Sequence, residues 1–95
     1  MSWVLDIHRD GTLQESVAVM NSIMTFGREE CDININDVKM SRHHCTFYMH
    51  NDTLTVVDNS STNGTFVNGR KIQRRDLKNN DEVIVGATNI LIRKV

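Results

Sequence analysis

Three polar segments of the chain carry side chains that could bind an anion. They are Gly27-Arg28, Ser41-Arg42-His43-His44 and the longer run 58–69, and together they supply guanidinium, hydroxyl and carboxamide groups. A phosphate monoester carries about −1.5 to −2 charges, and its natural partners are guanidinium, hydroxyl and backbone N–H groups. Carboxamides offer a donor and an acceptor together, which suits a peptide backbone. The three segments therefore predict a receptor for a phosphorylated peptide.

Two other phosphate or metal chemistries fit these residues less well. The run 64–71 is close to a nucleotide-binding P-loop, but Arg70 stands where that motif needs lysine, and no helix pattern follows. His43, His44 and Cys45 could suggest zinc, yet consecutive residues of a strand point to opposite faces of the sheet. The sequence thus predicts neither a metal site nor a cofactor.

A hydrolase is the third alternative. Ser41, His44 and Asp58 are the residue types of a catalytic triad. The chain lacks a nucleophile elbow around the serine and any evident segment for an oxyanion hole. A histidine that braces the core or a loop explains His44 better, and we do not expect the chain to be an enzyme.

The polar segments are separated by short runs in which apolar residues recur with period two, the pattern of half-buried strands. Asn51-Asp52 and Asn68-Gly69 separate such runs, and Asn-Gly is typical of a tight hairpin because both central residues need positive φ. The pattern predicts an all-β sandwich or barrel with the polar segments in its loops. The runs are 3–7, 13–20, 22–26, 31–35, 44–50, 53–57, 65–67, 71–72, 82–85 and 89–93.

Length and charge bound the class of protein. The 95 residues suit a single domain, and 11 Lys and Arg against 12 Asp and Glu give a net charge of −1. Nucleic-acid binders usually carry a basic excess, so we expect no direct nucleic-acid partner. No apolar run reaches the roughly 18 to 20 residues of a membrane span, and no signal peptide is evident, so we expect an intracellular protein without membrane contact.

The charge is unevenly distributed along the chain. Residues 1–38 hold two basic and seven acidic groups, a net of −5, whereas residues 39–95 hold nine basic and five acidic groups, a net of +4. The basic run 70–78 is expected to be a solvated loop face, with contact to an acidic partner or nucleic acid as the alternative. Cys31 and Cys45 are too few for a disulfide framework and are interpreted as small core residues.

In its polar segments the sequence resembles the forkhead-associated (FHA) family. The family's hallmarks are a Gly-Arg pair, a Ser-Arg-x-His segment and a loop with Asn-Gly that follows a strand. They stand here as Gly27-Arg28, Ser41-Arg42-His43-His44 and 61–65, followed by 67–69. The resemblance covers nearly the whole chain and implies an FHA-type β-sandwich of two twisted, mostly antiparallel sheets, with binding loops at one end. It also implies a non-catalytic, phosphothreonine-dependent peptide-binding module that mediates protein–protein interaction.

The resemblance assigns roles to individual residues. Arg28, Ser41 and Thr62 would contact the phosphate, and Arg42 and Asn63 would hold the peptide backbone around the phosphothreonine.

Other positions would shape the site. Lys39 would face the third residue after the phosphothreonine and favour an acidic side chain there. Gly27, His44 and Gly64 would be structural. The acidic pair Glu29-Glu30 beside the arginine would repel a dianion unless it points away.

The family also suggests a biological setting. We expect residues 1–95 to form one FHA domain, the N-terminal part of a longer protein of the kind found in DNA-damage or cell-cycle signalling, commonly in the nucleus. The alternative is an assembly module of the same fold that forms a homodimer through exposed strands and reads phosphopeptides weakly or not at all.

Overall fold

The structure is a computed structural model that describes residues 2–95, and they form a sandwich of two β-sheets. This confirms the predicted all-β class. The strands of the described chain are β1 (Trp3–Arg9), β2 (Thr12–Ala18), β3 (Ile23–Gly27), β4 (Ile33–Asn34), β5 (Cys45–His50), β6 (Thr53–Asp58), β7 (Thr65–Val67), β8 (Arg70–Ile72), β9 (Arg74–Asp76), β10 (Glu82–Val85) and β11 (Thr88–Lys94).

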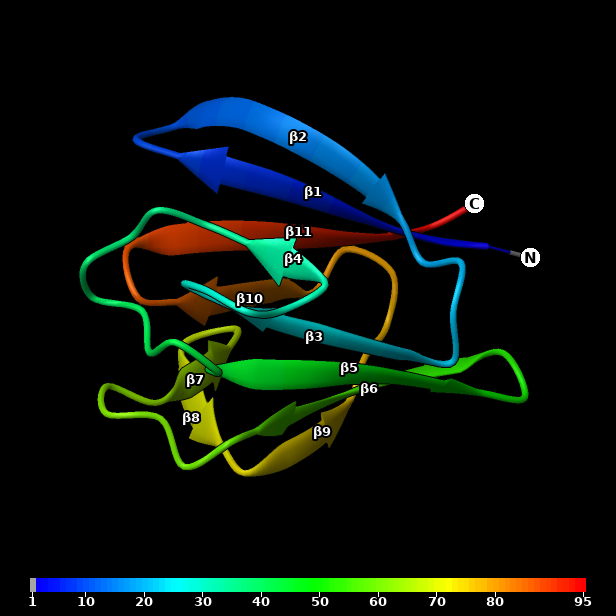
Figure 1. Ribbon diagram of the computed structural model, residues 1–95. Coiled ribbons are helices and arrows are strands. Elements are labelled where there is room, and N and C mark those ends of the chain that lie inside the picture. Colours follow the sequence, from blue (N-terminus) through cyan, green and yellow to red (C-terminus); the bar gives the residue numbers. More distant parts are fainter. Residues whose placement is uncertain (1) are drawn as a thin grey trace.

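The two sheets differ in size and lie face to face (Figure 1). The larger sheet has six strands in the order β2-β1-β11-β10-β7-β8, and the smaller has five in the order β4-β3-β5-β6-β9. Strands β3 and β4 pair in parallel, and the other pairs are antiparallel, as predicted.

Apolar side chains from the inner faces of both sheets form the core between them. Leu5 and Ile90 of the larger sheet and Phe26 and Phe47 of the smaller one are fully buried. The rings of Phe26 and Phe47 meet edge to face with their centroids 5.9 Å apart, a favourable aromatic geometry. The core fixes the register of β3 against β5, the two strands between which the first polar segments lie.

The predicted hairpins are present. Asn68 and Gly69 have φ of 51° and 85° between β7 and β8, and Asn51 and Asp52 have φ of 48° and 68° between β5 and β6. The expected strand over 31–35 is reduced to two residues, because the chain around it is held by turns rather than by a ladder.

The basic run 70–78 was expected in a loop, and this prediction is wrong for most of it. Residues 70–72 form β8 and residues 74–76 form β9, which are edge strands of the larger and the smaller sheet. Each has three residues and buries little. Residues 71–72 of β8 belong to a predicted strand run beside Asn68-Gly69, whereas no alternation of apolar residues marks β9 in the sequence. Charged side chains on short edge strands discourage edge-to-edge association.

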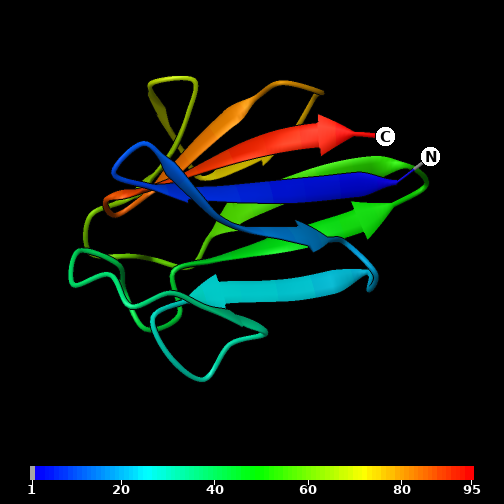
Figure 2. The same ribbon diagram turned by 90° about the horizontal axis from the view of Figure 1, so that it is seen from above.

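The loops that carry the polar segments meet at one end of the sandwich (Figures 1 and 2). Strand β3 ends and β5 begins at this end, because the two are antiparallel, and the end of β6 lies beside the start of β5. The chain ends marked N and C lie at the opposite end in both views, where the Ser2 and Val95 backbones are hydrogen-bonded at 2.7 Å. The sandwich therefore gathers the polar loops away from the chain ends.

Candidate functional site

The first part of the site is the segment that follows β3. The Arg28 N–H donates to the Ser41 carbonyl at 3.0 Å, and the His44 N–H donates to the Phe26 carbonyl at 3.0 Å. A Cβ at Gly27 would lie 2.0 Å from the Arg42 carbonyl oxygen, well inside van der Waals contact. A glycine is required here because the two backbones touch, and this contact places Arg28 beside Ser41.

His44 joins two of the loops. Its ring is fully buried, its Nδ1 accepts the Ser41 N–H at 3.0 Å, and its Nε2 lies 2.8 Å from the Gly64 carbonyl oxygen. Since Nδ1 is the acceptor, Nε2 carries the proton and donates to Gly64. Both ring nitrogens are therefore engaged by backbone, and neither is available to act as a base for the Ser41 hydroxyl. This geometry removes the triad of Ser41, His44 and Asp58.

Asp58 organises the third segment. Its carboxylate accepts the Ser61 and Thr65 hydroxyls at 2.6 Å and 2.7 Å and the Ser61 N–H at 3.1 Å, while the Ser61 hydroxyl accepts the Gly64 N–H at 2.9 Å. Burial alone would raise the pKa of Asp58, but these hydrogen bonds outweigh it and hold the pKa below its usual range. The loop 58–65 is thus folded around one ionised side chain.

Two hydrogen bonds bring this loop against the second segment. The Thr62 N–H donates to the Ser41 hydroxyl at 3.0 Å, and the Asn63 carboxamide donates to the Lys39 carbonyl at 2.8 Å. Thr62, Asn63 and Lys39 are exposed, and Ser41 is half-buried. The side chains that the sequence assigned to phosphate and to peptide backbone therefore lie on neighbouring loops.

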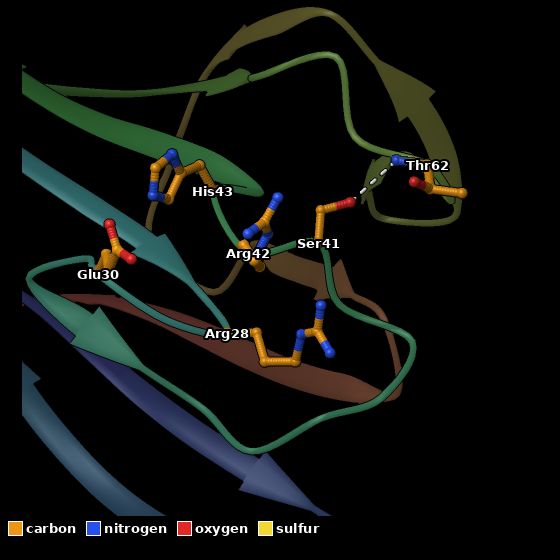
Figure 3. A pocket seen from close by; sticks show the side chains of 6 residues that line it. All are labelled: Arg28, Glu30, Ser41, Arg42, His43 and Thr62. Atoms are coloured by element: carbon orange, nitrogen blue, oxygen red, sulfur yellow. Dashed lines mark hydrogen bonds between the residues drawn. The ribbon is translucent and has the colours of Figure 1, made fainter.

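The three segments enclose an open pocket of about 460 Å³. Arg28 and Arg42 project into it beside the Ser41 hydroxyl, with Thr62 at one side (Figure 3). Neither guanidinium forms a hydrogen bond or ion pair with another side chain among residues 2–95. The lining is Arg28, Glu30, Ser41, Arg42, His43 and Thr62. Two unpaired guanidinium groups beside the hydroxyls of Ser41 and Thr62 form a donor set that suits a phosphate.

The structure thus gathers Arg28, Ser41, Arg42 and Thr62 around the pocket, whereas Asn63 lies in contact with the Lys39 backbone next to it. The remaining assigned residues, Gly27, His44 and Gly64, are buried beneath it.

Sequence reasoning missed two lining residues and one support. Glu30 and His43 line the pocket, although neither was assigned a binding role. Cys31, expected in the core, is partly exposed, and its thiol donates to the Arg42 carbonyl at 3.3 Å, which ties the first loop to the second. Cys45 is buried as expected.

Asp37 is the missed support. This buried carboxylate accepts the Lys39 N–H at 2.9 Å, the Ala87 N–H at 2.8 Å and the Thr88 hydroxyl at 2.8 Å. Burial alone would raise the pKa of Asp37, but the three hydrogen bonds lower it by more than burial raises it. The pKa of Asp37 therefore lies below its usual range. The Asp37 bond to the N–H two residues on is an Asx turn, and that turn chemistry was the available sequence signal. It anchors the loop before Ser41 to the β10–β11 turn.

No helix in the described part of the chain is long and apolar enough to cross a membrane. Residues 2–95 also bring together no group of three or more His, Cys, Asp or Glu side chains that could hold a metal ion.

Comparison with known proteins identifies the family. The model of the FHA domain matches residues 24–86, a span that includes all three polar segments. The chain belongs to the FHA family. Solved FHA structures agree over the whole length: one from a study of phosphothreonine-dependent FHA domain interactions has a TM-score of 0.92 and 25% identity, covering 100% of this chain and 98% of the other. The FHA domain of the CT664 protein from Chlamydia trachomatis has a TM-score of 0.93 and 25% identity, covering 100% and 99%.

Curated FHA relatives are similar over part of their length. The glycogen accumulation regulator GarA of Mycobacterium tuberculosis is 41% identical over 66 residues, 68% of this chain and 41% of GarA. The oxoglutarate dehydrogenase inhibitor of Corynebacterium jeikeium is 40% identical over 57 residues, 60% of this chain and 40% of that protein. The DNA damage response protein kinase DUN1 of Saccharomyces cerevisiae is 29% identical over 85 residues, 77% of this chain and 16% of the kinase. The chain spans about two fifths of the length of the bacterial relatives. As an FHA domain, this chain is a binding module and not an enzyme.

Proposed function

We propose that this FHA domain binds proteins through a phosphorylated threonine and thereby mediates protein–protein interaction in signalling by Ser/Thr kinases. The pocket that unites Arg28, Ser41 and Thr62 from three segments of the chain is the observation that carries the proposal. A dianionic phosphate there would accept from the Arg28 guanidinium and the Ser41 and Thr62 hydroxyls. Membership of the FHA family and the similarity to a phosphothreonine-dependent FHA structure support the same ligand.

The neighbouring residues would hold the peptide around the phosphothreonine. Arg42 borders the pocket, and Asn63 has a carboxamide oxygen left to accept from a peptide N–H after its donor bond to Lys39. The exposed Lys39 side chain would favour an acidic residue downstream of the phosphothreonine. One dianion with a few backbone contacts corresponds to an affinity in the micromolar range.

The relatives favour a regulator of metabolism over a DNA-damage mediator. The names of the bacterial relatives refer to glycogen accumulation and to an oxoglutarate dehydrogenase, both of which belong to intracellular metabolism. These relatives are 40 to 41% identical to this chain over the matched residues. The yeast DNA-damage kinase is 29% identical. We therefore place the proposed function inside the cell, in the control of an enzyme or pathway by phosphorylation, and not in the nucleus.

A peptide titration tests the proposal. The same sequence is synthesised with phosphothreonine, phosphoserine or threonine, and its affinity for the 95-residue chain is measured by calorimetry. We expect binding of the phosphothreonine form and at least about tenfold weaker binding of the threonine form, since the charged contacts are lost. Equal affinity for the phosphorylated and unphosphorylated peptides would overturn the proposal.

Two matched variants locate the binding site. Arg28→Ala should weaken phosphothreonine binding by about 100-fold, because hydrogen bonds to charged groups are worth about 1.5 to 3 kcal/mol each. Its thermal unfolding should not change, because the side chain supports no other residue. Arg70→Ala removes an exposed arginine from β8, outside the pocket, and should leave binding unchanged.

The homodimer alternative has a long exposed edge strand in its favour. Strand β2, of seven residues, lies at one edge of the larger sheet and is mostly exposed. Its pairing with β1 is interrupted by a register shift after Ile7, and such a bulge bends an edge away from a partner. Sedimentation of the isolated chain decides, and we expect a monomer.

A further inference from the structure

The pocket contains a carboxylate that no residue of the described chain neutralises. Glu30 lines it together with Arg28 and Arg42, and its side chain is exposed. Among residues 2–95 the only salt bridge joins Arg93 to Asp6, and no side-chain hydrogen bond involves Glu30. Figure 3 shows the Glu30 carboxylate on the same side of the pocket as His43, with Thr62 on the other side.

The loop holds Glu30 in this place. Its φ of 59° lies in the left-handed region, which residues other than Gly, Asn and Asp seldom adopt, so the surrounding bonds must impose it. The next residues supply them: the Cys31 N–H and carbonyl are both bonded to the Asn34 carboxamide at 2.9 Å, and the Asp32 N–H donates to the Thr25 hydroxyl at 2.8 Å. The backbone therefore cannot readily carry Glu30 away from the pocket.

If Arg28 binds a phosphate, the pocket holds two negatively charged groups, the phosphate and the Glu30 carboxylate. Their repulsion weakens binding unless a cation lies near both. Arg28 and Arg42 would face the phosphate, so a cation of the peptide is the partner that would favour the exposed Glu30 carboxylate beyond what solvent screening provides. A lysine or arginine of the peptide could contact the carboxylate while the neighbouring phosphate offsets its repulsion from the two arginines.

We infer that Glu30 forms a subsite for a basic residue of the bound peptide, close to the phosphothreonine and on the side of the pocket bounded by Glu30 and His43. The inference rests on the proposed phosphothreonine binding and names the class of peptide. The carboxylate of Glu30 accepts from the ammonium or guanidinium group, and His43 borders the same subsite.

Asn63 follows Thr62 on the opposite side of the pocket, and its carboxamide donates to the Lys39 carbonyl. Together with the acidic preference proposed for the exposed Lys39 side chain, the subsite would select a peptide with a basic residue on one flank of the phosphothreonine and an acidic residue on the other.

A charge scan of the peptide tests the subsite. In a phosphothreonine peptide with alanine at the three positions on each side, single residues are changed to lysine or to glutamate, and each affinity is measured by fluorescence anisotropy. On one flank the lysine peptide should bind about two- to fivefold tighter than the alanine peptide and the glutamate peptide correspondingly weaker, the range for an exposed ion pair.

Variants assign the effect to one carboxylate. Glu30→Gln should abolish the preference for lysine, and Glu30→Lys should reverse it. Glu29→Gln is the matched control, because Glu29 is also an exposed acid of the same loop but does not line the pocket, and this variant should keep the preference. Thermal unfolding of the three variants shows that each remains folded.

The outcomes separate the two proposals. If lysine, alanine and glutamate peptides bind wild type equally at all positions while Arg28→Ala still weakens binding about 100-fold, phosphothreonine recognition stands and the subsite is overturned. The subsite also fails if Glu29→Gln removes the lysine preference as fully as Glu30→Gln does. If phosphorylation itself makes no difference to affinity, both proposals fall.

Discussion

Two arginines of the molecule stand in opposite situations. Arg93, on β11 of the larger sheet, donates from Nε and Nη2 to Asp6, whose carboxylate also accepts the Ser16 hydroxyl at 2.6 Å. These contacts hold the pKa of Asp6 below its usual range. Arg28, at the loop end, has no such partner among residues 2–95. The Arg93–Asp6 pair of the larger sheet is satisfied within the protein, whereas the loop end leaves the Arg28 and Arg42 guanidinium groups free.

The loop end nevertheless has a firm scaffold. Its backbone is held by a neutral histidine, His44, and by two carboxylates, Asp37 and Asp58, whose hydrogen bonds are made within the protein. The groups that hold the loops and the groups that face the pocket are therefore different residues. This division predicts that substitutions can damage the loop scaffold and the ligand-binding groups separately, except at Ser41, which belongs to both.

Gly27→Ala should have the largest effect on the scaffold. The added Cβ would meet the Arg42 carbonyl at 2.0 Å, and forcing two backbones apart should cost about 3 kcal/mol of the free energy of unfolding, the upper range for overpacking. Phosphopeptide affinity should fall with it, because Arg28 and Ser41 separate. Denaturant unfolding and peptide titration measure the two effects.

Gly69→Ala is the matched control for this substitution. Gly69 has a positive φ of 85° but no atom near the added Cβ, so only backbone strain of about 1 to 2 kcal/mol is expected and affinity should not change. A loss of affinity as large as that of Gly27→Ala would show that general destabilisation, and not loop separation, weakens binding.

Asp37→Asn should have the second largest effect. One of the three donors that face Asp37 would then meet an amide NH₂ group, which should cost about 2 kcal/mol of stability. Binding should weaken as well, because the Lys39 backbone loses its anchor. Asp10→Asn removes the same charge from an exposed turn and should change neither property. Unchanged unfolding of Asp37→Asn would mean that the anchor is dispensable.

Arg93→Ala is expected to have a smaller effect and a different one. The side chain of Arg93 is 40% exposed, so solvent screens its pair with Asp6, and the melting temperature should fall by no more than about 5 °C. Phosphopeptide affinity should stay the same, the reverse of the result for Arg28→Ala. Reduced affinity in Arg93→Ala would show that the sheet and the loop end are coupled.

Acid should produce the most gradual effect. The pKa values of Asp6, Asp37 and Asp58 are all lowered in the folded protein, so their contribution to stability is complete above the unfolded pKa of about 3.9 and is lost as the pH falls through the folded values. Stability should therefore be level with respect to these groups from pH 7 to 5 and fall below about pH 4. Melting curves between pH 7 and 2.5 measure this dependence of stability on pH. In Asp58→Asn, the stability should fall less steeply at acid pH than in wild type.

Much of the fold was predictable because its signals are local. Period-two apolar runs gave most strands, and Asn68-Gly69 gave a hairpin through its need for positive φ. Strand β9 was missed because an edge strand of three residues, with charged side chains, has no buried face to leave a pattern. Short strands of this kind are defined by their neighbours in the sheet.

The residues of the site likewise fall into those that the sequence predicted and those that it did not. The resemblance to the FHA motifs assigned Arg28, Ser41 and Thr62 to the phosphate and Arg42 to the peptide backbone, and the pocket that the structure shows contains all four. Glu30 could not be placed from the sequence, since the direction of its side chain depends on a left-handed residue inside a braced turn. Asp37 was overlooked because its partners Ala87 and Thr88 lie about fifty residues away.

The exception to the division between scaffold and pocket is the hydroxyl of Ser41. It accepts the Thr62 N–H, and its own proton has no acceptor among the described residues. A hydroxyl that donates to an oxyanion becomes a better acceptor, because hydrogen bonds in a chain polarise one another. An anion in the pocket would therefore strengthen the bond that joins the two loops. Occupancy and loop closure would then be cooperative, and the module would be stiffer with its ligand than without it.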